Sequence, residues 1–138
     1  EPLFPGVRGV IDKLAARDDV VLGIATGKSQ RGVAAVLSHH GLEGLFSTIQ
    51  TADDAPSKPH PAMVLQAMAA TGAEPMDTVL IGDTSFDMVM ARAAGARAIG
   101  VTWGYHTTEL LRQSGAERLV SDADELMRAI DEVWEAVP

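Results

Sequence analysis

The stretch Val79-Leu80-Ile81-Gly82-Asp83-Thr84-Ser85-Phe86-Asp87 decides which fold this sequence predicts. Its first three residues are apolar and two of them are β-branched, which predicts a buried β-strand. Gly82 then opens a turn, and we expect a helix from about Ser85 to Ala94. Asp83 falls where the strand gives way to that helix. Asp87 follows four residues later, about one helical turn further on.

The two aspartates of this stretch are candidate metal ligands. In an open α/β sheet, ligands bind beyond the carboxyl ends of the strands, where Asp83 and Asp87 would lie. Mg²⁺ prefers oxygen ligands, so two carboxylates held there could bind it. The alternative is structural: Asp83 would only cap the helix, and Asp87 would be a solvated acid in its first turn. The stretch alone leaves both interpretations open.

The rest of the chain repeats the same strand-and-helix alternation. Apolar runs predict further strands at Val20–Ala25, Ser47–Thr51, Arg97–Thr102 and Arg118–Val120. The first of these runs is nearly continuous, which is typical of a strand buried on both faces. Helical periodicity predicts helices at Val7–Leu14, Ser29–Gly41, Ala62–Gly72, His106–Ser114 and Asp122–Val137, the second with Val33, Val36 and Leu37 on its inner face.

Strands that alternate with helices predict a parallel sheet covered by helices on both faces. We therefore expect an α/β protein with a three-layer, Rossmann-like parallel sheet. The chain begins at Glu1 rather than Met, and no strand precedes the first helix. We thus expect residues 1–138 to form one α/β core domain that is incomplete at its N-terminus.

Composition narrows the class of partner. The formal net charge of −8 argues against nucleic acid or an anionic membrane as the main partner, while a local site could still bind a small phosphorylated metabolite. The chain has no cysteine, which excludes a disulfide framework, a thiolate nucleophile and a Cys-ligated metal. Its four histidines show no metal spacing and are interpreted as surface residues. No apolar run reaches the ~20 residues of a membrane helix, so we expect a cytoplasmic protein.

Three loops that follow strands carry polar side chains suited to phosphoryl transfer. Thr26 and Gly27 follow the first strand, Lys58 follows the second, and the two acids follow the third. In a parallel sheet these loops share one edge, where a hydroxyl, a backbone amide, an ammonium and carboxylates could position a phosphate and neutralise its charge. Each has a structural alternative, because Thr26 could be a helix N-cap and Lys58 a solvated loop lysine.

The ordered set of motifs resembles the haloacid dehalogenase-like superfamily, and within it the phosphoglycolate phosphatase-like branch. The resemblance extends from Pro5 to about Val133. The motifs that carry it are Pro5-Gly6-Val7, Ala25-Thr26-Gly27-Lys28, Lys58-Pro59, Gly82-Asp83-Thr84-Ser85-Phe86-Asp87 and Gly100-Val101-Thr102-Trp103-Gly104-Tyr105. Dehalogenases of the superfamily carry Ser-Asn at the place of Gly82-Asp83, so the resemblance favours a phosphatase.

The resemblance implies a role for each candidate residue. Thr26 would bind the phosphoryl group that is transferred, and Gly27 would add a backbone contact. Lys58 would stabilise the charge of an aspartyl-phosphate intermediate. Asp83 would ligate Mg²⁺, and Asp87 would either support the water shell of the metal or orient Lys58. The implied activity is a Mg²⁺-dependent phosphatase that acts on a small phosphate monoester.

The family's first motif is not found in this sequence. That motif, a strand ending in Asp-x-Asp-Gly-Thr, supplies the nucleophile and a second metal ligand, and a small cap domain follows it. Asp122-Ala123-Asp124 follows only a short apolar segment and opens an amphipathic helix, so we reject it as this motif. Because the family's first strand is central in the sheet, we expect an unpaired gap between neighbouring strands, which could favour association. We also expect negligible activity from these residues alone.

Two other classes of function stay open on the sequence. A bacterial receiver domain shares the size, the parallel sheet, a Thr or Ser and a Lys-Pro pair, but its acids come first in the chain. Here the order is Thr26, Lys58, Asp83 and Asp87, which counts against it. A non-catalytic binding or assembly module would explain the missing first motif, whereas the retained motifs argue against it.

Overall fold

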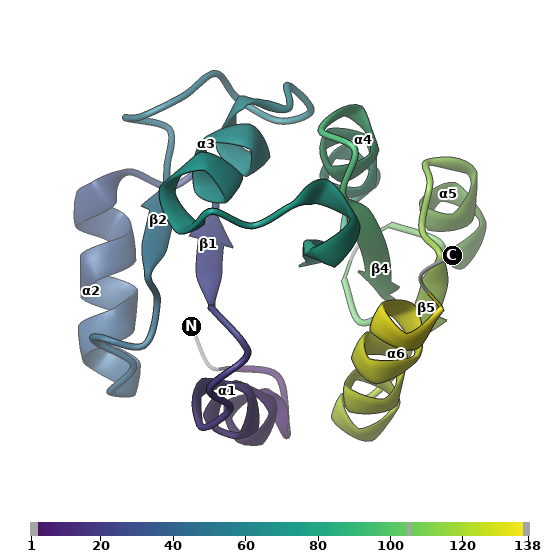
Figure 1. Cartoon of the computed structure of the whole chain (residues 1–138), viewed down its shortest axis with the longest axis horizontal. Helices are drawn as coiled ribbons and strands as arrows, with labels where there is room; N and C mark the ends of the chain where they lie inside the picture. The colour runs from purple at the N-terminus through teal and green to yellow at the C-terminus, as the bar shows by residue number, and fades with distance from the viewer. Residues whose placement is uncertain (1–2, 105, 137–138) are drawn as a thin grey trace.

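A computed structural model describes residues 3–104 and 106–136 of the chain, and Figure 1 shows its course. The strands are β1 (Gly23–Ala25), β2 (Thr48–Gln50), β3 (Val79–Gly82), β4 (Arg97–Val101) and β5 (Arg118–Val120). The α-helices are α1 (Val7–Ala15), α2 (Gln30–His40), α3 (Ala62–Thr71), α4 (Ser85–Ala93), α5 (Thr108–Gln113) and α6 (Ala123–Glu135). The predicted order of elements is confirmed, although the predicted end of the last helix at Val137 lies outside the described residues.

The strands form two parallel sheets rather than one. In the first sheet β1 pairs with β2, and in the second the order is β3-β4-β5. Figure 1 shows β1 and β2 on the left and β4 and β5 on the right. The expected three layers are present, because α1 and α6 pack on one face of the second sheet while α4 and α5 pack on the other. The parallel sheet is therefore divided between β1 and β3, which agrees with the unpaired gap that we expected between neighbouring strands.

An apolar slot of about 570 Å³ lies between the two sheets. Its two long walls are the segments Val20–Ala25 and Asp77–Ile81, and residues of helices line both of its faces. Val64 and Met68 of α3 lie on one face, and Leu14 of α1 and Ile130 of α6 lie on the other. This slot separates the two sheets along all of β1 and along Val79–Ile81 of β3.

The open slot overturns two burial predictions. Val21 is 58% exposed, so the run Val20–Ala25 is not buried on both faces, and its β-ladder is limited to Gly23–Ala25. Ile81 is 38% exposed, so β3 is not a buried strand. The physical reason is the same for both segments, since each has a paired neighbour on one side only. Val36, predicted on the inner face of α2, is also exposed because Val33 and Leu37 alone turn that helix toward the core.

The two sheets run in the same direction. At the amino ends of the strands, the Trp134 indole N–H donates to the Asp77 carbonyl, and the Arg17 guanidinium lies over the Trp134 ring while its ion pair with Asp131 holds it to α6. At the carboxyl ends, Lys58 pairs with Asp87 across the loops that follow β2 and β3. Both ends of the slot are thus bridged, which keeps β1 and β3 parallel. No helix in the described part of the chain is long and apolar enough to cross a membrane.

Candidate active site at the carboxyl edge

Lys58 and Asp87 form the centre of the candidate site. The Lys58 ammonium lies 2.6 Å from Asp87 Oδ1, and both side chains are largely shielded from solvent, with 26% and 7% of their surfaces exposed. The other Asp87 oxygen, Oδ2, accepts hydrogen bonds from the Thr84 hydroxyl at 2.8 Å and the Thr84 N–H at 3.2 Å. The carboxylate is therefore fully engaged, and the Lys58 ammonium is held in a fixed position. The structural alternatives for these two residues, in which Lys58 is a solvated loop lysine and Asp87 a solvated acid, are therefore wrong.

Two local features hold Asp87 in this position. Thr84 and Asp87 form a capping box at the start of α4, in which each side chain accepts a bond from the other residue's backbone N–H. Gly82 makes room for the carboxylate, because a Cβ at Gly82 would overlap the Asp87 Cβ and lie 2.6 Å from Oδ2. The sequence Gly82 to Asp87 thus places this acid by its own local geometry.

Asp83 differs from Asp87 in having a free carboxylate. It is half-buried at the carboxyl end of β3, and within residues 3–104 and 106–136 its side chain has neither a hydrogen bond nor an ion pair. It packs over Gly104, where a Cβ would lie 2.8 Å from the Asp83 Cγ. Thr84, not Asp83, is the N-cap of α4, so the capping alternative for Asp83 is wrong. Asp83 is the acid of this edge that is available to a ligand.

Thr26 and Gly27 lie at the carboxyl end of β1. The Thr26 hydroxyl accepts from the Lys28 N–H at 3.2 Å, and Ser29 rather than Thr26 is the N-cap of α2. A Cβ added to Gly27 would meet no atom within 4 Å, so its backbone faces open space. Both residues therefore occupy the predicted loop, although neither forms a hydrogen bond or an ion pair with Lys58 or Asp83 in the described part of the structure.

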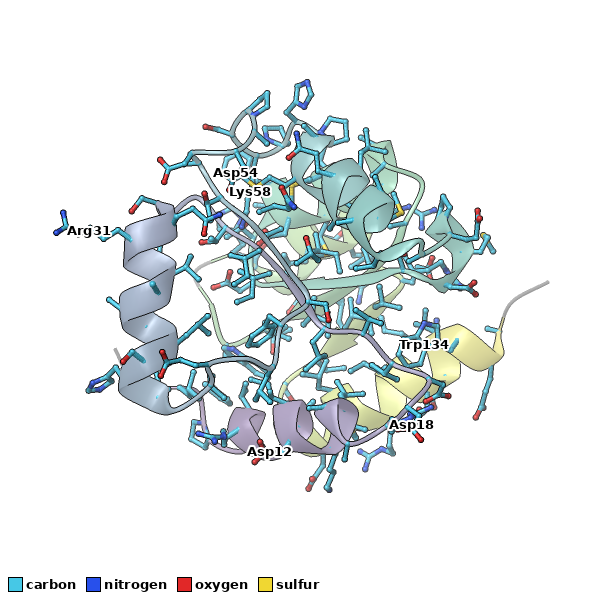
Figure 2. The ribbon with its side chains drawn as sticks, turned by 60° about the vertical axis from the view of Figure 1, so that its left-hand side comes forward. Asp12, Asp18, Arg31, Asp54, Lys58 and Trp134 are labelled. Atoms are coloured by element: carbon cyan, nitrogen blue, oxygen red, sulfur yellow. The ribbon has the colours of Figure 1, made fainter. Side chains whose placement is uncertain are left out.

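A polar network joins the loops that follow β1 and β2. The Asp54 carboxylate accepts from the Thr51 hydroxyl at 2.7 Å and from the Gln30 side-chain amide at 2.6 Å, and the Gln30 N–H donates to Asp53. Asp54 and Lys58 both belong to the loop after β2, and Figure 2 labels them at the same end of the molecule. The hydrogen bonds from Thr51 and then from Gln30 lower the pKa of Asp54. This network fixes the start of α2 relative to the loop that carries Lys58.

His106 belongs to the same edge, contrary to our prediction that all four histidines are surface residues. Its Nδ1 accepts the Ser85 N–H at 2.9 Å, and its half-buried ring makes an edge contact with Phe86. His106 therefore satisfies a free amide at the start of α4, the helix that presents Asp87. No local sequence pattern predicts this contact, because Ser85 and His106 are 21 residues apart.

The described residues fit a magnesium ion only in part. No group of three or more His, Asp or Glu side chains in the described ranges could hold a metal. Asp83 offers one free carboxylate, whereas Asp87 is occupied by Lys58 and Thr84. Mg²⁺ commonly takes one or two protein carboxylates and completes its shell with water and substrate phosphate. Asp83 is compatible with that pattern, but further ligands would have to come from outside these residues.

Comparison with known proteins shows the family to which this chain belongs. The sequence profile of the haloacid dehalogenase-like hydrolase family matches residues 2–101, which include Thr26, Lys58, Asp83 and Asp87. The chain therefore belongs to the haloacid dehalogenase-like hydrolase family. This finding confirms the resemblance and rules against the receiver interpretation.

Named relatives include phosphatases. The chain is 39% identical over 133 residues to the probable phosphatase IndB of Dickeya dadantii, covering 93% of this chain and 58% of that protein. It is 31% identical over 126 residues to the phosphoglycolate phosphatase of Haemophilus influenzae, covering 91% and 56%. A hydrolase structure from Pseudomonas syringae superposes with a TM-score of 0.83 at 28% identity, covering 94% and 59%. The chain thus spans a little over half the length of these relatives.

Proposed function

We propose that this chain is the core of a longer phosphatase that hydrolyses a small phosphate monoester with the help of Mg²⁺. The observation that carries the proposal is the fixed Lys58–Asp87 pair, together with the free carboxylate of Asp83 at the carboxyl end of β3. A held ammonium can neutralise phosphate oxygens, and a free carboxylate can bind a hard cation. The phosphatase names of the relatives support the reaction class.

The chemistry needs a nucleophile from outside the 138 residues. An aspartate carboxylate would attack the phosphorus, the ester P–O bond would break, and the alcohol would leave with a proton. Water would then cleave the aspartyl-phosphate and release inorganic phosphate. Asp122 cannot replace that nucleophile, because its carboxylate caps α6 by accepting the Glu125 N–H at 2.8 Å. We therefore expect the 138-residue chain alone to have negligible phosphatase activity.

The residues present would bind and orient the phosphate. Thr26 and the backbone of Gly27 would contact its oxygens at the start of α2, and Lys58 would neutralise them. Asp87 would act through Lys58, since its ion pair supports the orienting role over the metal-shell role. Asp83 would hold the magnesium ion, which supplies charge neutralisation at the transferring group.

The proposal is tested with variants of the full-length protein that carries this chain. Lys58→Ala and Asp83→Asn should each lower turnover of p-nitrophenyl phosphate by at least ~100-fold, as expected for loss of a group that stabilises transition-state charge. Leu110→Ala, a change at an exposed residue of α5, serves as the control and should retain activity. Near-normal turnover in either site variant would remove the assignment. The cytoplasmic location and the association of copies stay predictions.

A further inference from the structure

Side chains from two different loops hold the first turn of α4, the turn that contains Asp87. On one side, the Lys58 ammonium from the loop after β2 pairs with the Asp87 carboxylate. On the other side, the imidazole Nδ1 of His106, from the loop after β4, accepts the Ser85 N–H at 2.9 Å. The capping box joins Thr84 to Asp87 alone, so it shapes the turn without fixing it to either loop. The position of the turn therefore depends on Lys58 and on His106.

The loop that carries His106 also lies against Asp83. A Cβ added to Gly104 would lie 2.8 Å from the Asp83 Cγ, so the backbone at Gly104 packs directly against that side chain. His106 follows two residues after Gly104 and bonds to Ser85, two residues after Asp83. The loop after β4 thus contacts this segment at two points, once at the acidic side chain and once at the backbone. Movement of Ser85 away from the loop would move the Asp83 carboxylate as well.

His106 is itself held in place on two sides. Its half-buried ring makes an edge contact with the Phe86 ring, with the two centroids 5.7 Å apart. Its backbone directly precedes Thr107, the N-cap of α5, whose hydroxyl accepts the Leu110 N–H at 3.2 Å. A ring that is fixed by packing in this way can in turn fix the amide that it binds.

From this arrangement we infer that His106 is a positioning residue of the candidate site. Its Nδ1 atom holds the start of α4 against the loop after β4, and this contact keeps the Asp83 carboxylate in place at the end of β3. The effect on turnover rests on the proposed function, whereas the hold on the turn does not.

The bond requires an acceptor at one defined atom of the side chain. Because Nδ1 accepts the Ser85 N–H, the neutral ring carries its proton on Nε2. In asparagine, the acceptor Oδ1 occupies the same place along the side chain as Nδ1 in histidine. His106→Asn should therefore keep the bond to Ser85. His106→Phe keeps a ring against Phe86 but has no acceptor, so it should lose that bond.

Amide hydrogen exchange in the full-length protein that carries this chain tests the hold on the turn without any turnover. In His106→Phe, the Ser85 amide should exchange about fivefold faster than in the parent protein. The amides of Thr84 and Asp87, which share the capping box, should also exchange faster. In His106→Asn, all three should exchange at the parent rates. Unchanged exchange in His106→Phe, or equal acceleration in both variants, would overturn the inference.

Turnover of p-nitrophenyl phosphate tests the effect on the site. In His106→Phe, kcat should fall about tenfold and the Mg²⁺ concentration for half-maximal turnover should rise about tenfold, as is typical when a group that orients a metal-binding residue is lost. His106→Asn should stay close to the parent protein in both values. Glu117→Gln, which weakens the fold at its ion pair with Arg97, controls for stability and should also leave both values unchanged. Parent-like values in His106→Phe, or the same loss in His106→Asn, would contradict the positioning role.

The two measurements separate this inference from the proposed function. If Lys58→Ala and Asp83→Asn keep normal turnover, the proposed function fails, and exchange at Ser85 alone decides whether His106 holds the turn. If those two variants lose turnover while His106→Phe does not, the proposed function stands and His106 has no positioning role.

Discussion

Gly82→Ala is the substitution whose effect the structure specifies most fully. The added methyl group would overlap the Asp87 Cβ and lie 2.6 Å from its Oδ2. Both atoms are anchored, because Asp87 is held by the Thr84 capping box and by Lys58. The clash must therefore displace the carboxylate or the backbone of α4, and with it the position of the Lys58 ammonium.

The expected loss of stability follows from three contributions. Overpacking costs about 1–3 kcal/mol, and disruption of the capping box adds about 1 kcal/mol. The reduced entropy of the unfolded chain with alanine offsets about 0.5 kcal/mol. The free energy of unfolding should thus fall by about 1.5–3.5 kcal/mol, which lowers the melting temperature by about 5–14 °C for a chain of this size.

Thermal unfolding followed by circular dichroism measures this change, with Gly27→Ala as the matched control. A methyl group at Gly27 meets open space, so that variant should stay within about 0.5 kcal/mol of the parent. In an Asp87→Gly background, Gly82→Ala should cost at least ~1 kcal/mol less, because both the Cβ and the carboxylate that the methyl group would overlap are already gone. Equal melting temperatures for Gly82→Ala and Gly27→Ala would refute the reasoning.

Three further predictions concern groups around the site and the sheet. Glu117→Gln should lower the free energy of unfolding in urea by about 3 kcal/mol, because it leaves the buried Arg97 guanidinium without its carboxylate. Asp54 has a lowered pKa, so it stabilises the fold above the unfolded pKa of about 4, and that stabilisation is lost as pH falls through the folded pKa. Asp54→Asn should therefore flatten the decline of the melting temperature below pH 4, and an unchanged decline would contradict this. His106→Ala removes the acceptor of the Ser85 N–H and should cost about 1 kcal/mol in urea unfolding, whereas a cost near zero would show that solvent replaces it.

Much of the fold could be predicted from local patterns. The residues Val79 to Asp87 encode a strand, a turn and a capped helix within nine positions, and the structure contains all three. The order of the other strands and helices follows in the same way from hydrophobic periodicity. The placement of Thr26, Lys58 and Asp83 after strands also follows from the sequence, because parallel strands put such loops on one edge.

Other features depend on residues far apart in the chain. Burial of Val21 and Ile81 requires a neighbour on the far side of their strands, and only the tertiary structure shows that β1 and β3 face a slot instead. The contact of His106 with the start of α4 also crosses a long stretch of chain.

The sequence by itself determined the class of fold, the motif order and the loops that carry the candidate residues, because these depend on short-range periodicity and turn chemistry. Tertiary structure alone decided how the two aspartates differ. Lys58, from the loop after β2, forms an ion pair with Asp87, while Asp83 lies over Gly104 with its carboxylate free. The physical reason is that hydrogen bonds and ion pairs depend on three-dimensional distance, which sequence spacing does not specify.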